Sequence, residues 1–306
     1  MNQGSISIYF NRFWDGFIEG TDPVSVSFFV ELFTRVFNTR IVIERNIDNA
    51  SILCENACRI HDSAMNKKSW IHSILFTGES VVSFGNLTDS HYSHFSQFSC
   101  FLSGLATNKN LKRIQCPLFI SYLFCNPDKS MVPVDSVPKE RACAVIGNPK
   151  GKVRNKFLDK LETVTSISYG GRFRCNIEQP LAGHYHSATI FDFMKKHQFV
   201  ITMENNEEDY YITEKICNGF FAGVIPIYWG SPHIAEYIHQ DRFLHLKNDS
   251  DEECERIIQQ IMSMDDELYL KIVHSPILKN NVDTMIQHIA EDIKSMLGYT
   301  NDNIIE

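Results

Sequence analysis

Two runs of alternating strand and helix patterns, separated by a polar, proline-spaced segment, constrain the fold of this chain more than any other feature. The separating segment covers residues 126–140, where prolines lie among Asp, Ser and Lys. Segments of this composition pack poorly and often bridge domains. The chain has 306 residues, enough for two α/β domains. We therefore predict an N-terminal domain over residues 1–135 and a C-terminal domain over residues 136–306.

Within each run, the apolar pattern predicts the order of the elements. Strands are expected at 5–10, 41–43, 51–53 and 71–76 in the first run, and at 142–146, 164–168, 199–203 and 224–228 in the second. Helices are expected from an Asp22-Pro23 start through Phe37, and at 153–161, 191–196, 213–221, 252–264 and 282–297. Such a βαβ rhythm is typical of parallel sheets with helices on both faces. We expect two facing Rossmann-like domains with a ligand cleft at the carboxyl ends of the strands.

Charge and hydropathy exclude two classes of partner. The net charge of −8 argues against nucleic-acid binding, which needs a basic face. No stretch approaches the roughly 18 to 20 apolar residues of a membrane-spanning helix, so we expect no integral membrane segment. The N-terminus lacks the basic and apolar regions of a signal peptide. These features together predict a cytoplasmic location.

The segment 199–232 carries the most chemical information. It reads FVITMENNEEDYYITEKICNGFFAGVIPIYWGSP and predicts strand, polar loop, helix, strand and turn. Thr213 can cap the helix, whose N-terminus favours a phosphate, and Lys215 adds a positive charge there. Glu214 can accept hydrogen bonds from sugar hydroxyls, although an acidic residue in a first helical turn also fits ordinary capping chemistry. Pro226 favours an edge position for its strand.

Several ordered motifs in this segment resemble the donor-binding region of the α-1,3/α-1,4-fucosyltransferases, glycosyltransferase family ten. They are Glu204-Asn205, the Tyr-x-Thr-Glu-Lys run at 211–215 and the Pro-x-Tyr-Trp-Gly turn at 226–230. The likeness is strongest to the soluble bacterial-type members. Three weaker matches lie outside the segment: the helix start at 151–157, the Tyr-Gly-Gly strand end at 169–171, and the Phe-Thr-Gly-Glu element at 76–79.

This resemblance implies a GT-B-like fold and a role for particular residues in binding GDP-β-L-fucose. Arg154, Lys215 and the helix start at Thr213 would stabilise the pyrophosphate of the donor. Asn205 and Tyr211 would line the nucleotide pocket. The first domain would bind the acceptor and the second the nucleotide sugar.

The resemblance also implies an inverting transfer of L-fucose to an oligosaccharide or glycoconjugate acceptor, at O3 of a GlcNAc- or Glc-type residue. Glu79 would be the general base on the acceptor hydroxyl, and Glu214 would contact the donor sugar or its ribose. No Asp-x-Asp triplet follows a predicted strand, so we expect no cofactor and no essential divalent metal. A transferase that uses another nucleotide sugar, and a non-catalytic glycan- or nucleotide-binding relative, remain as alternatives. An α/β dehydrogenase would need Gly-x-Gly-x-x-Gly after the first strand, where none occurs.

Overall fold

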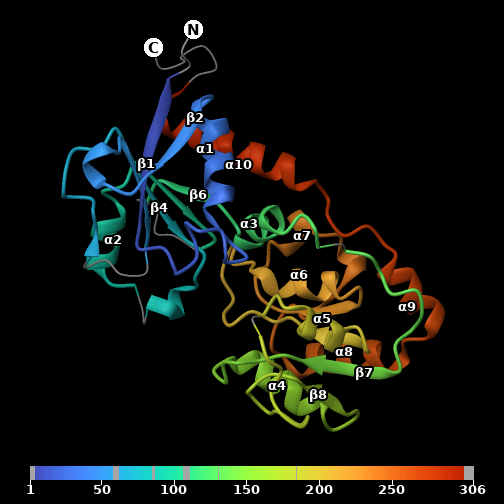
Figure 1. The fold of residues 1–306 in the computed structure, drawn as a ribbon. Coiled ribbons are helices and arrows are strands. Elements are labelled where there is room, and N and C mark those ends of the chain that lie inside the picture. Colours follow the sequence, from blue (N-terminus) through green and yellow to red (C-terminus); the bar gives the residue numbers. More distant parts are fainter. Residues whose placement is uncertain are drawn as a thin grey trace. The chain divides into compact units, whose positions relative to one another are not determined.

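The computed structural model describes residues 4–57, 62–84, 87–105, 111–129, 131–183 and 185–299. The chain forms two compact units, each with its own parallel sheet (Figure 1). The first unit comprises residues 1–126, 209–211 and 280–306, and the second comprises 127–208 and 212–279. The predicted α/β class with two parallel-sheet domains is confirmed.

The sheet of the first unit has six strands in the order β2-β1-β3-β4-β5-β6. These are β1 (Ser5–Asn11), β2 (Arg40–Glu44), β3 (Ile52–Asn56), β4 (His72–Thr77), β5 (Cys100–Ser103) and β6 (Arg113–Gln115). All five pairings are parallel. The central strand β3 is buried along its whole length, as expected for a strand covered on both faces.

The helices of the first unit include one from the far end of the chain. They are α1 (Val26–Phe37), α2 (Asp89–Phe95), α3 (Leu118–Cys125) and α10 (Val282–Leu297). Figure 1 shows α10, in red, beside the blue α1, and α10 packs on both α1 and α3. The Arg35 guanidinium of α1 is 2.5 Å from the Asp283 carboxylate of α10. The helix predicted at 282–297 is therefore present, but it packs in the first unit and not in the C-terminal half to which we assigned it.

The sheet of the second unit has five strands in the order β11-β10-β9-β7-β8. Its strands are β7 (Glu140–Ala144), β8 (Ile167–Tyr169), β9 (His197–Ile201), β10 (Ile225–Tyr228) and β11 (Leu244–His245). Its helices are α4 (Lys152–Leu161), α5 (Ala188–Met194), α6 (Glu214–Phe221), α7 (Ile234–Tyr237), α8 (Asp251–Ser263) and α9 (Asp266–Val273). All pairings are parallel here too.

Three local predictions are corrected by the structure. Helix α1 starts at Val26 with Ser25 as its N-cap, because Asp22 accepts a hydrogen bond from the Val24 N–H in a turn instead. Strand β8 is three residues long and not five. Pro226 lies in β10, which has a neighbouring strand on each side and is not an edge strand. Strand β11 pairs only with Ile227 and Tyr228, so proline's lack of an N–H costs no hydrogen bond to β11.

Two further observations concern the helices and the linker. None of the helices in the described ranges combines the length and the apolar character needed to span a bilayer. The predicted linker at 126–140 begins at Asn126, the C-cap of α3. Its described residues from there to Lys139 form no strand or helix. The compact units divide after residue 126, slightly before the predicted division at 135.

Candidate functional site

The strand order of the second unit places its ligand-binding position between β7 and β9. Chain connections run to opposite sides of the sheet from these two neighbouring strands, which leaves a crevice at their carboxyl ends. The loop after β7 leads to Arg154, and the loop after β9 contains Glu204 and Asn205. Of the predicted site residues, Arg154 lies in the first turn of α4, Asn205 lies on the loop after β9, and Thr213, Glu214 and Lys215 lie at the start of α6.

Arg154 lies in the first turn of α4, folded back over the helix start. Its guanidinium donates to the Asn148 carbonyl at 2.5 Å and to Asn205 Oδ1 at 3.4 Å. A Cβ on Gly151 would lie 2.8 Å from the Arg154 Cζ, so the missing side chain at 151 makes room for this conformation. Arg154 is only 3% exposed, and its Nε has no hydrogen-bond partner among the described residues. Burial, with repulsion from Arg174, lowers the pKa of Arg154.

Glu204 connects the end of β9 to the start of α6. Its carboxylate accepts from the Thr213 N–H at 2.8 Å and from the Thr213 hydroxyl at 2.9 and 3.0 Å. It also lies 2.8 Å from the Lys215 ammonium, which donates to Thr213 Oγ1 at the same distance. Thr213 is the N-cap of α6, as predicted. The sequence motifs at 204–205 and 211–215 are thus joined by direct contacts.

The carboxylate of Glu204 has no exposed surface. Burial raises its pKa, the Lys215 charge opposes that shift, and the nearby Glu214 charge adds to it. The turn after β10 closes over it: the Glu204 N–H donates to the Trp229 carbonyl at 2.8 Å, and a Cβ on Gly230 would lie 2.6 Å from Glu204 Cγ. The Pro-x-Tyr-Trp-Gly turn therefore serves to enclose this buried carboxylate.

The structure brings together Arg154, Asn205, Thr213, Lys215 and Glu214, the last lying 3.8 Å from the Lys215 ammonium. We predicted roles for all five residues but none for Glu204. The signal was present, because Glu204 is an acidic residue that follows a buried strand and precedes the Thr-Glu-Lys run.

Tyr211 is placed differently from these five residues. It belongs with residues 209–211 to the first unit, where the Tyr210 N–H donates to the Gly104 carbonyl at 2.8 Å. A Cβ on Gly104 would lie 2.9 Å from the Tyr211 nitrogen. Tyr211 is buried, and its predicted part in nucleotide binding stays a prediction.

Glu79 lies in the first unit, two residues after the end of β4. Its side chain is exposed and accepts from the Ser83 hydroxyl at 2.8 Å, while its N–H donates to Thr77 Oγ1 at 3.1 Å. The carboxylate is thus presented to solvent from a strand end, where a catalytic group of an α/β domain would lie. Its role as a base stays a prediction.

A second buried carboxylate, Glu55 on β3, was not predicted. Strand β3 lies between β1 and β4, and the strand order of the first sheet reverses where β3 pairs with β1. Glu55 pairs with Arg12 and accepts from Asn11 at 2.8 Å, from Ser63 at 2.7 Å and from the Ala64 N–H at 2.7 Å. These contacts tie together the loops that follow β1 and β3.

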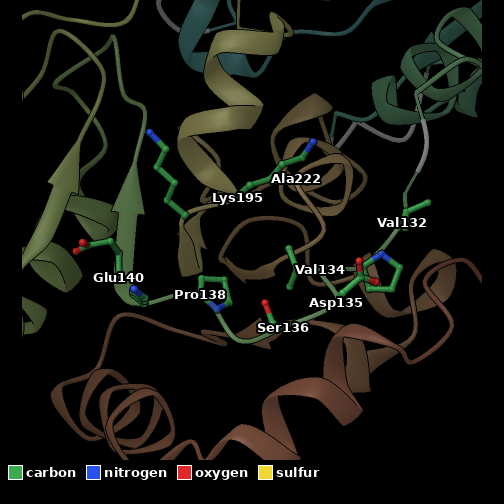
Figure 2. Close-up of a pocket in the computed structure, with 11 residues that line it drawn as sticks. Val132, Val134, Asp135, Ser136, Pro138, Glu140, Lys195 and Ala222 are labelled. Atoms are coloured by element: carbon green, nitrogen blue, oxygen red, sulfur yellow. The ribbon is translucent and has the colours of Figure 1, made fainter.

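Figure 2 shows a pocket of the second unit at the opposite edge of the sheet. It is lined by residues of the segment from Val132 to Pro138, by Glu140, which begins β7, and by Lys196, which precedes β9. None of the predicted site residues lines this pocket. Within the described residues, no group of three or more His, Cys, Asp and Glu side chains is arranged to hold a metal ion.

Comparison with solved structures defines the fold class. The chain is similar to a crystal structure of an α1,3-fucosyltransferase with GDP-fucose, with a TM-score of 0.64 and 18% identity, covering 98% of this chain and 91% of that one. A second structure of an α1,3-fucosyltransferase, with GDP, gives a TM-score of 0.67. These likenesses confirm the GT-B-like α/β fold class.

The family follows from the sequence of the second unit. Residues 137–274 match the family model described as the C-terminal part of glycosyltransferase family 10 (fucosyltransferase). The match confirms the resemblance of this part of the chain to that family. The match includes Arg154, Glu204 and the start of α6.

Curated relatives match over shorter stretches. An α-(1,3)-fucosyltransferase of Helicobacter pylori is 32% identical over 114 residues, which cover 37% of this chain and 23% of the relative. A GDP-fucose protein O-fucosyltransferase 3 of Canis lupus familiaris is 28% identical over 144 residues, 46% of this chain and 26% of the relative. The matched stretches thus span about a quarter of the length of these relatives.

Proposed function

We propose that this chain is an inverting fucosyltransferase that moves L-fucose from GDP-β-L-fucose to a hydroxyl of a glycan acceptor. One observation carries the proposal: Arg154 and Lys215 lie in the first turns of two helices at the carboxyl edge of the family 10 domain, and Asn205 and Glu204 link them to adjacent positions after β9. A guanidinium suits bidentate phosphate contact, and an ammonium at a helix start adds charge where phosphate already binds well. This arrangement fits a diphosphate.

The desolvated state of Arg154 supports the same ligand. Burial lowers the pKa of a cation because it removes the water that stabilises the charge. The guanidinium is nevertheless held beside two neutral oxygen acceptors, from Asn148 and Asn205. An incoming pyrophosphate would supply the missing counter-charge and a partner for Nε.

In the proposed reaction, the acceptor oxygen attacks the anomeric carbon of fucose as the bond to the β-phosphate oxygen breaks. GDP leaves with the electron pair of that bond, and the acceptor proton goes to the Glu79 carboxylate. Arg154 and Lys215 stabilise the charge that builds on the departing diphosphate, and Glu214 contacts the donor sugar or its ribose. A single displacement inverts the anomeric centre.

We also propose that the transfer needs no divalent metal, because cationic side chains take the part that a metal would play on the diphosphate. The measurement is transfer in excess EDTA compared with transfer in Mg²⁺ or Mn²⁺. Equal rates support the proposal, and a rate that requires the ion contradicts it.

The acceptor is the least constrained partner. We propose O3 of a GlcNAc- or Glc-type residue, since one relative is named an α-(1,3)-fucosyltransferase. Another relative is named a protein O-fucosyltransferase, so protein hydroxyls belong in the same acceptor screen. Transfer from a different nucleotide sugar would retain the architecture and change the donor.

The proposed base gives the first test of the activity. Glu79→Gln should lower kcat for fucose transfer by about 10²- to 10⁴-fold, because no base remains to take the proton from the attacking hydroxyl. Its GDP affinity should change by less than about twofold, because no contact of Glu79 reaches the diphosphate-binding side chains in the proposal. Transfer rates and GDP titrations measure the two effects separately.

Glu31→Gln, on helix α1, is the matched control and should leave transfer unchanged. Full transfer by Glu79→Gln would remove Glu79 from the mechanism. Absence of transfer by the wild type to every glycan and protein acceptor, while another fucosyltransferase is active in the same buffer, would contradict the proposed activity.

A further inference from the structure

The contacts of Glu204 have a consequence for the Lys215 ammonium. Lysine carries its charge on a flexible four-carbon stem, so an unrestrained ammonium must lose conformational freedom when it binds a phosphate. Here Glu204 Oε2 and Thr213 Oγ1 each lie 2.8 Å from the ammonium. Two acceptors that are themselves buried thus define its position before any ligand arrives.

The position of Glu204 is in turn fixed from the opposite side. Its backbone N–H is bonded to Trp229, and the absence of a side chain at Gly230 leaves the space that the Glu204 methylenes fill. The position of the carboxylate is therefore set by the segments that directly follow β9 and β10. Groups held in this way by packing and hydrogen bonds are what preorganises a binding site.

We propose that Glu204 is a positioning residue, which holds the Lys215 ammonium at the first turn of α6 in the geometry that receives the donor diphosphate. This inference rests on the proposed function. A buried carboxylate is a costly way to stabilise a fold, since an apolar pair of similar volume often does so equally well. Stabilisation of the fold therefore does not explain why a charged residue stands at position 204. Holding the Lys215 ammonium in place does explain it.

The test is Glu204→Gln in two backgrounds. Glutamine retains an oxygen that can accept from the Thr213 N–H, but it loses the charge and can present its NH₂ to the Lys215 ammonium. In the wild-type background, Glu204→Gln should weaken GDP binding by about tenfold or more. In a Lys215→Met background, the same change should alter GDP affinity by less than about twofold, because the group it positions is gone.

Two further variants keep the test decisive. Glu207→Gln, on an exposed carboxylate of the same loop, should bind GDP as the wild type does. If Glu204→Gln does not fold, as judged by thermal unfolding, Glu204→Asp retains the charge but withdraws it by one methylene. It too should weaken GDP binding, and an affinity equal to that of the wild type would overturn the inference.

The remaining outcomes separate the two proposals. Wild-type GDP binding with an equal loss from Glu204→Gln in both backgrounds would overturn the positioning role, because the effect would then not pass through Lys215. Wild-type GDP binding with no loss in Glu204→Gln would overturn it as well. A folded wild type that binds no GDP would overturn the proposed function and this inference with it.

Discussion

At the scale of single residues, two buried carboxylates show how neighbours decide the charge state of a group. Neither Glu55 nor Glu204 has exposed side-chain surface. Burial raises the pKa of both, but at Glu55 the nearby His94 imidazole, whose Nε2 is 3.6 Å from the carboxylate, and hydrogen bonds from Asn11, the Ala64 N–H and Ser63 outweigh it and lower the pKa. At Glu204 burial prevails over the attraction of Lys215, so its pKa is raised. The two carboxylates differ because Glu204 also faces the negative charge of Glu214, whereas the groups around Glu55 stabilise its charged form.

The lowered pKa of Glu55 predicts a pH dependence of stability. A carboxyl group with a depressed pKa in the folded state contributes stability that is fully present above its unfolded value, which is about 4.5 for glutamate. That contribution is lost as the pH falls through the folded pKa. The wild type should therefore be more stable than Glu55→Gln at pH 7, and the difference should shrink below about pH 4.5.

Urea unfolding of both proteins between pH 7 and pH 3 measures this difference in the free energy of unfolding. A difference that stays constant over the range would contradict the account of Glu55. Glu31→Gln, whose carboxylate is partly exposed on α1, is the control and should show little difference at any pH.

Residues with local signals were predictable, and those defined by distant partners were not. Thr213, Lys215 and Arg154 lie at helix starts, as predicted from the sequence, and their part in phosphate binding stays a prediction. Glu55 acquires its role from Arg12, 43 positions away, and Glu204 from a turn that follows another strand. Periodicity contains no information on such pairs, because it describes one element at a time.

At the scale of elements, the start of α6 and the turn after β10 are joined by their contacts with Glu204. The turn packs against Glu204, and Glu204 caps the helix through Thr213. The helix N-terminus is thereby held at the carboxyl edge of the sheet, where its dipole favours a negative ligand.

Gly230→Ala tests how closely the turn after β10 packs against Glu204. The added Cβ would lie 2.6 Å from Glu204 Cγ and 2.7 Å from the Tyr228 hydroxyl, both of which are buried. Such overpacking should lower the free energy of unfolding by about 1–3 kcal/mol. Gly147→Ala, where an added Cβ meets nothing within 4 Å, should change it little. Equal stability of Gly230→Ala and the wild type in urea unfolding would show that the turn can relax.

The fold was predictable where helices have a strong apolar stripe and less so elsewhere. The helix at 282–297 was predicted with its observed limits, since its buried residues recur at helical spacing. An apolar stripe shows that a helix packs against another part of the protein but does not identify that part. The position of α10 beside α1 could therefore not be inferred. Strands of two or three residues, such as β11, β6 and β8, are too short for a pattern to define their ends.

At the scale of the whole molecule, both sheets reverse their strand order after the first strand of each unit. Each therefore offers a ligand position at the carboxyl ends of its central strands. The second unit has Arg154 and Lys215 near that position, and the first has Glu55 there, with Glu79 just after the end of the neighbouring strand β4. In the function we propose, the cations of the second unit would bind the diphosphate, and Glu79 of the first unit would take the hydroxyl proton.

The most direct test of the central claim is isothermal titration of the purified protein in EDTA with GDP-fucose, GDP-mannose and UDP-galactose, with Lys215→Ala alongside. We predict selective binding of GDP-fucose, weakened at least about tenfold in Lys215→Ala because a charged contact to the diphosphate is lost. Lys195→Ala, which removes an exposed lysine that lines the pocket at the opposite edge of the sheet, should bind as the wild type does. Absence of binding to all three donors, with a known transferase binding its donor in the same buffer, would contradict the claim.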